Sequence, residues 1–76
     1  MKNEILDILE DILPSIDFKS SDALMDDMIL DSVAVVQIIS ELSVEYGIEF
    51  SFEDLAPENF NSLDAITELV QKKLDK

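Results

Sequence analysis

Apolar residues recur three or four positions apart, the spacing of one helix face, in three segments of the chain. The segments run from about Glu4 to Leu13, from Val33 to about Tyr46, and from Leu63 toward the C-terminus. Acidic and polar residues fill the remaining positions of the first segment, as on a helix that covers a core with one side. The pattern predicts three long helices.

Residues that start and stop helices flank these segments. Asn3 is the expected N-cap of the first helix and Pro14 closes it, while Gly47 is expected to end the second in a left-handed conformation. Either Asn61 or Ser62 can cap the third helix. Lysines gather at the C-terminal end of the last segment, where the helix dipole favours cations: Lys72, Lys73 and Lys76.

A shorter helical signal lies between the second and third segments. Ser51 is followed three positions later by Asp54, the spacing of a capping box, and Pro57 is expected to interrupt or restart the turn. The stretch from Ser15 to Met28 has no sustained period, so we expect a solvated loop that a few apolar residues pin to the core. We therefore predict an all-α bundle of three long helices plus one short helix.

The composition narrows the class of protein. The 76 residues suffice for a single domain, which we expect to span 1–76, but not for a deep catalytic cleft. The chain has no His and no Cys, which excludes disulfides, a thiol nucleophile and histidine acid–base catalysis. We expect a cytoplasmic protein, because no apolar run reaches the ~18 residues of a membrane span and the N-terminus lacks a signal-peptide pattern.

The charge of the chain limits its partners. Eighteen acidic and five basic side chains give a formal net charge of −13. This charge repels phosphate backbones and anionic lipids, so nucleic acid and membrane surfaces are poor candidate partners. The acidic excess either steers basic protein partners toward the domain or only keeps it soluble, and the composition leaves both readings open.

Asp31 and Ser32 lie where an apolar run meets the second helical segment. Unpaired backbone N–H groups and the positive end of the helix dipole converge at such a position, so a phosphate ester on the Ser32 hydroxyl would be stabilised there. Asp and Ser are also the commonest helix caps, and taken alone the pair favours capping. The alternatives for Ser32 are a phosphodiester site and a plain N-cap.

The whole pattern resembles the acyl carrier and peptidyl carrier protein family, whose members are small acidic helical bundles. The resemblance rests on the loop that ends in Asp-Ser, on the second helical segment and on the segments behind it: residues 24–32, 33–46, 47–50, 52–55 and 60–66. It implies a 4′-phosphopantetheine arm attached to Ser32. It also implies that Asp31 helps the transferase that attaches the arm to hold its metal ion.

By this resemblance the chain is a free-standing acyl carrier protein and not an enzyme, and it has no catalytic residue of its own. It carries an acyl or aminoacyl group as a thioester on the arm. The implied partners are a phosphopantetheinyl transferase, an acyl- or aminoacyl-activating ligase and downstream acyl-transfer enzymes, and we expect a monomer. The expected partner-binding surface beside Ser32 comprises Val33, Gln37, Glu41 and Val44, with Ile48 and Leu55 at its edge or beneath it.

Two features leave the type of carrier open. The run Ile29-Leu30-Asp31-Ser32-Val33 lacks the glycine of the Gly-Ala-Asp-Ser-Leu of fatty-acid carriers, and looks more like the Leu-Leu-Asp-Ser of D-alanine carrier proteins for cell-wall teichoic acid modification. Bulky residues are expected to fill the space between the helices, which favours a short or polar cargo: Val36, Ile39, Ile48, Phe50, Phe60 and Ile66.

The rival hypothesis from another class is a non-carrier protein-interaction module. In that case Ser32 is only a helix cap, and the exposed Val33 and Val44 bind another protein permanently.

Overall fold

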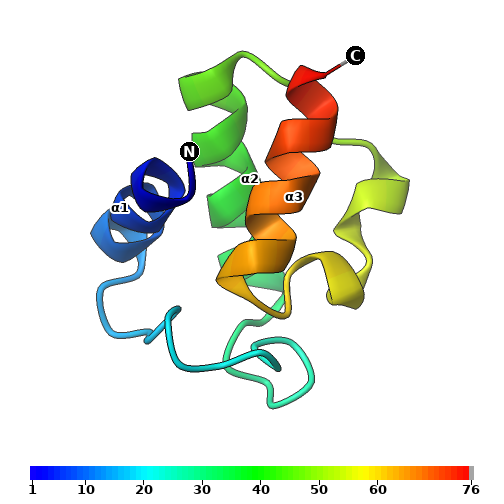
Figure 1. Ribbon diagram of the computed structural model, residues 1–76. Coiled ribbons are helices and arrows are strands. Elements are labelled where there is room, and N and C mark those ends of the chain that lie inside the picture. Colours follow the sequence, from blue (N-terminus) through cyan, green and yellow to red (C-terminus); the bar gives the residue numbers. More distant parts are fainter. Residues whose placement is uncertain (76) are drawn as a thin grey trace.

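The computed structural model describes residues 1–75 and consists of three α-helices and two short 3₁₀ helices (Figure 1). Its elements are α1 (Lys2–Ile12), α2 (Ser32–Tyr46), η1 (Phe52–Leu55), η2 (Pro57–Asn59) and α3 (Leu63–Leu74). The all-helical prediction is confirmed, since residues 1–75 contain no strand. Lys76, predicted to lie among the C-terminal lysines, is outside the described residues.

Two 3₁₀ helices, η1 and η2, take the place of the single short helix that the sequence predicts. Ser51 and Asp54 form the expected capping box at the start of η1, with the Asp54 carboxylate accepting from the Ser51 backbone N–H at 2.7 Å. Ala56 then adopts an extended conformation, with φ −59° and ψ 138°, and Pro57 begins η2. Proline disfavours a helical conformation in the residue before it, so the turn stops at Ala56 and restarts.

Helix α1 begins two residues earlier than predicted. Its N-cap position is Met1, whose carbonyl accepts from the Ile5 backbone N–H at 3.0 Å. Asn3 therefore lies inside the first turn with its side chain exposed, and the prediction that it caps the helix was wrong. The first turn needs no side-chain cap because N–H groups at an exposed helix end can bond to water.

A continuous core joins the three helices. Its largest fully buried side chains come from all three helices, from the loop after α1 and from the residue after η2: Phe18, Phe60, Ile5, Leu9, Leu24, Leu30, Ile38, Leu42, Ile66 and Val70. The α2 stripe is narrower than predicted, because Val36 is 54% exposed. Val35 and Ile38 face the core instead, and Val36 lies about 100° around the helix from Val35.

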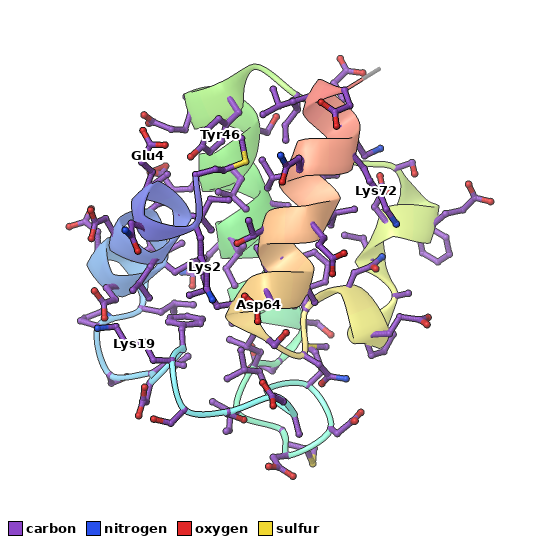
Figure 2. The ribbon with its side chains drawn as sticks, viewed as in Figure 1. Lys2, Glu4, Lys19, Tyr46, Asp64 and Lys72 are labelled. Carbon is purple, nitrogen blue, oxygen red and sulfur yellow. The ribbon has the colours of Figure 1, made fainter. Side chains whose placement is uncertain are left out.

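Helix α1 packs against both α2 and α3. The side chains of Lys2 and Asp64 point toward one another across the α1 and α3 boundary, 2.6 Å apart (Figure 2). Both are more than half exposed, so this pair adds little stability. In Figure 1, α2 and α3 both begin at the end of the molecule where the long loop lies.

The long loop is pinned to the core as predicted. Phe18 and Leu24 are 1% and 0% exposed, and Met25 is half-buried. Gly47 ends α2 in the predicted left-handed conformation, with φ 63°. Within residues 1–75, no helix has the length and apolar character required to cross a membrane.

Candidate functional site

Ser32 is the first residue of α2 and its side chain is exposed. The N-cap is its neighbour Asp31, which is extended (φ −113°, ψ −177°) and whose Oδ1 accepts from the Ala34 backbone N–H at 2.8 Å. The hydroxyl of Ser32 makes no hydrogen bond to any residue of the 1–75 range. The structure thus gives the capping role to Asp31 and leaves the Ser32 hydroxyl accessible and uncommitted.

The start of α2 is electrostatically suited to an anion. The backbone N–H groups of Ser32 and Val33 precede the first intrahelical bonds and point out of the helix end. The first turn of α2 contains no acidic side chain, and the aligned peptide dipoles place a partial positive charge there. A phosphodiester on Ser32 Oγ would lie beside these donors. The second carboxylate oxygen of Asp31 accepts no hydrogen bond within residues 1–75 and can take a cation.

We call residues 24–31 the serine loop, since they lead into Ser32. The carbonyl oxygen of Leu24 accepts from the backbone N–H groups of both Ile29 and Leu30, each at 2.9 Å. This closes the loop on itself. Within it Met28 adopts a left-handed conformation with φ 60°, which costs a non-glycine residue roughly 1 kcal/mol. Leu30 is 2% exposed, so it anchors the loop in the core one residue before Asp31.

Ser32 lies at the mouth of a surface hollow with apolar walls. Its lining residues are Met25, Ser32, Val35, Val36 and Leu55. A second hollow, under the 90% exposed side chain of Phe52, is lined by residues 52, 53 and 55–57, so the two hollows share Leu55. Apolar side chains thus form most of the hollow beside the serine, in a chain of net charge −13.

The sequence did not reveal the extent of this apolar surface. Val33 was expected to be exposed. The structure shows four further exposed apolar residues, which are between 43% and 90% exposed: Met28, Ile29, Val36 and Phe52. One signal was available: no charged residue occurs between Ser32 and Ser40.

The four residues predicted to meet partners all lie on the exposed face of α2. Val33, Gln37, Glu41 and Val44 follow one another at spacings of four, four and three, so they share one side of the helix. Val33 and Val44 are 68% and 82% exposed. Of the residues expected at the edge of this face or beneath it, Ile48 is buried and Leu55 is half-buried.

The residues predicted to line a cargo space do not enclose one space. Phe60 and Ile66 are 0% exposed and Ile48 is 7% exposed, so they are packed into the core. Ile39 and Phe50 instead line a shallow hollow with Ser40 and Ser43. Val36 lies in the hollow at Ser32, so its predicted place in the interior was wrong.

An ion pair helps to hold the segment that carries Leu55. The Asp54 carboxylate pairs with the Lys73 ammonium of α3, and their side chains are only 18% and 22% exposed. The hydrogen bond from Lys73, followed by that from the Ser51 backbone, holds the pKa of Asp54 below its ordinary value of 3.8. No residue of η1 or η2 is buried. The outer wall of the hollow is therefore held by this ion pair together with Leu55, which is half-buried and packs against the edge of the core.

One comparison with known proteins identifies this arrangement. The model of the family described as "Phosphopantetheine attachment site" matches residues 3–70, most of the chain. No curated protein and no solved structure gives a significant match.

Proposed function

Because this chain belongs to the phosphopantetheine attachment site family, whose members carry 4′-phosphopantetheine covalently on a serine, we propose that Ser32 is the serine that receives the arm. The observation that carries this proposal is the exposed, unbonded hydroxyl of Ser32 at the first position of α2. Asp31 already caps the helix, so modification of Ser32 breaks no hydrogen bond of the fold.

The residues at the start of α2 fit the group. The helix end offers backbone N–H donors to the phosphodiester, and the exposed position leaves room for a transferase. In the attachment, Ser32 Oγ forms a new bond to phosphorus as the phosphoanhydride of coenzyme A breaks. The adenosine bisphosphate leaves, and the hydroxyl proton passes to the transferase. Asp31 offers its free carboxylate oxygen to the metal ion of the transferase.

The bound arm supplies a terminal thiol that holds an acyl or aminoacyl group as a thioester. The chain itself presents this group to partner enzymes and catalyses no step. The carboxylate beside Ser32, that of Asp31, accepts from the Ala34 backbone N–H and not from the Ser32 hydroxyl, and residues 1–75 contain no histidine or cysteine to act as a stronger base.

The direct test is the intact mass after incubation with coenzyme A and a broad-specificity phosphopantetheinyl transferase. We expect the protein to gain the mass of one arm and Ser32→Ala to gain none. Ser40→Ala is the matched control, because Ser40 is a second exposed serine of α2. An unmodified wild-type protein, or a Ser32→Ala variant that still gains the arm, would contradict the proposal.

The exposed face of α2 is the proposed docking surface for the partner enzymes. Val33 adjoins Ser32, whereas Val44 lies about 16 Å further along the helix axis, at 1.5 Å per residue. Val33→Ser is therefore expected to lower the kcat/KM of transferase and ligase more than Val44→Ser. Leu74→Ser is the control, because Leu74 is an exposed aliphatic residue at the other end of α3. Equal effects of all three would contradict this surface.

The proposed cargo is short or polar. Phe60 and Ile66 fill the space between the helices, and a bundle at native packing density has no room for a long chain there. Loading the modified protein with acyl groups of increasing length, and measuring the melting temperature of each, tests the proposal. We expect no steady rise with chain length. A progressive rise would show that the bundle opens to enclose the chain, and would favour a fatty-acid cargo.

A further inference from the structure

Three consecutive backbone N–H groups of the loop before α2 donate to a single residue at the start of α3. The Leu24 N–H donates to the carbonyl oxygen of Asn61 at 2.8 Å. The N–H groups of Met25 and Asp26 both donate to the Asn61 side-chain Oδ1, at 2.9 and 3.1 Å. Asn61 Nδ2 in turn donates to the Asp26 carboxylate at 3.3 Å. Asn61 thus commits its carbonyl and both side-chain polar groups to the serine loop.

Asn61 is itself held firmly. The residue before it, Phe60, is 0% exposed, and Leu63 two residues later is 5% exposed. The cap of α3 is Ser62, whose Oγ accepts from the Ala65 backbone N–H at 3.0 Å. Of the two caps that the sequence allowed, the structure uses Ser62. The Asn61 side chain is therefore free to bind the loop.

The serine loop connects Asn61 to Ser32. Leu24, bonded to Asn61 through its N–H, accepts through its carbonyl from Ile29 and Leu30. Leu30 is followed directly by Asp31, which caps α2 through Ala34. Hydrogen bonds, joined by the Leu30–Asp31 peptide bond, therefore lead from the start of α3 to the start of α2, at the end of the molecule where both helices begin (Figure 1).

From this geometry we infer that Asn61 is a positioning residue for the modification of Ser32, acting through the serine loop. The inference rests on the proposed attachment at Ser32. Asn61 touches no reacting atom. It keeps the loop in the one conformation that presents the Ser32 hydroxyl to a transferase, although the loop contains a left-handed Met28.

The expected effect falls on KM rather than on kcat. Without the Asn61 side chain, the Met25 and Asp26 N–H groups lose their acceptor and the loop samples other conformations. If the competent conformation falls to about a tenth of the population, the apparent KM for the carrier rises about tenfold, because only that fraction binds productively. The bound complex is unchanged, so kcat stays near its wild-type value.

The test measures KM and kcat of a phosphopantetheinyl transferase for Asn61→Ala and the wild-type protein, well below the melting temperature of the less stable one. Asn59→Ala is the matched control. It removes the same side chain two residues away, where the amide donates to the Asp54 carbonyl and not to the serine loop. We expect a raised KM for Asn61→Ala and a wild-type KM for Asn59→Ala.

Exchanging the side chains of Asp26 and Asn61 distinguishes a positioning role of Asn61 from a general loss of structure. This test also applies if Asn61→Ala does not fold. Asn61→Asp keeps the acceptor but places a second carboxylate against Asp26, so its KM should rise. The double variant Asp26→Asn/Asn61→Asp restores one donor and one acceptor, so its KM should return to the wild-type value.

The outcomes also separate this inference from the proposed function. A wild-type KM for Asn61→Ala, the same shift for Asn59→Ala, or an exchanged pair no better than Asn61→Asp would overturn the inference while modification of Ser32 stands. A wild-type protein that gains no arm would overturn the proposed function instead.

Discussion

Two irregular segments border Ser32, and they are held to the helices by different means. The serine loop is anchored by the buried Leu24 and Leu30 and by hydrogen bonds from three of its backbone N–H groups to Asn61. The η segment, residues 52–59, has no buried residue and is fastened to α3 by the Asp54–Lys73 ion pair. Each lines the hollow at Ser32, the loop through Met25 and the η segment through Leu55.

Because they are held by different means, the two segments should respond differently to pH and salt. Buried leucines and amide hydrogen bonds respond little to pH or salt, so the loop keeps Ser32 in place under varied conditions. An ion pair weakens when its carboxylate is protonated, and local structure with few buried contacts opens at low free-energy cost. The η segment should therefore respond more to pH and salt than the serine loop does.

The largest contrast is expected from truncating an apolar residue in each segment. Leu24→Ala empties a site that is 0% exposed and should lower the free energy of unfolding by about 3 kcal/mol. Phe52→Ala removes a larger side chain that is 90% exposed and should change it by less than about 0.5 kcal/mol. Urea denaturation measures both. Similar losses would mean that the η segment is packed as firmly as the loop.

A smaller difference in stability is expected between substitutions of Asp31 and of Ser32, at the end of the serine loop. Asp31→Ala removes the cap of α2 and should cost about 1 kcal/mol, whereas Asp31→Asn keeps a capping oxygen and should cost little. Ser32→Ala should lie within about 0.5 kcal/mol of the wild-type protein, because its hydroxyl makes no hydrogen bond to the described residues. Thermal denaturation of the three variants at neutral pH measures these differences. A larger cost for Ser32→Ala would return the capping role to the serine.

The features that the sequence predicted correctly are those that depend on neighbours along the chain. Helical periodicity located α2 and α3, the single glycine marked the left-handed end of α2, and the Ser51 to Asp54 spacing marked the capping box. The sequence predicted that apolar residues would hold the long loop to the core, and Phe18 and Leu24 do so, whereas Met28 of the same loop is 85% exposed. The attachment of the arm to Ser32 remains a prediction.

The features that escaped prediction depend on residues distant in sequence. Asn61 and Asp26 are 35 positions apart, and no local pattern pairs them. Val36 belongs to an apolar stripe whose width depends on the elements that pack against it, and in the folded chain Val35 and Ile38 are buried whereas Val36 is 54% exposed. The choice between Asn61 and Ser62 as a cap was likewise decided by the loop that occupies Asn61.

The Asp54–Lys73 ion pair of the η segment should make the stability of the protein depend on pH. Because the folded-state pKa of Asp54 is lowered below 3.8, its ionisation stabilises the fold above about pH 4, and that contribution is lost as pH falls through the lowered value. Lys73→Gln should therefore lower stability by at most about 1 kcal/mol at neutral pH, and the difference should vanish in acid.

Lys2→Gln is the control for this effect, since it makes the same change in net charge. It breaks the Lys2–Asp64 pair, whose side chains are 53% and 71% exposed, and should cost less. Urea denaturation of both variants from neutral pH to pH 3 measures the difference. A Lys73→Gln effect that does not shrink as pH falls below 4 would assign it to packing of the lysine chain rather than to the ion pair.

The smallest effect is expected at Met28, the strained residue of the serine loop. Met28→Gly removes the cost of a left-handed conformation at φ 60°, and the side chain lost is 85% exposed. Glycine also gives the unfolded chain more freedom, and since the two terms are each about 1 kcal/mol they nearly cancel, leaving a change within about 0.5 kcal/mol. Met28→Ile keeps the strain and adds a branched Cβ, so it should be the less stable of the two. Urea denaturation of both variants provides the measurement. If Met28→Gly instead raised stability by more than about 1 kcal/mol, the hydrogen bonds of the loop would be holding more strain than one left-handed residue accounts for.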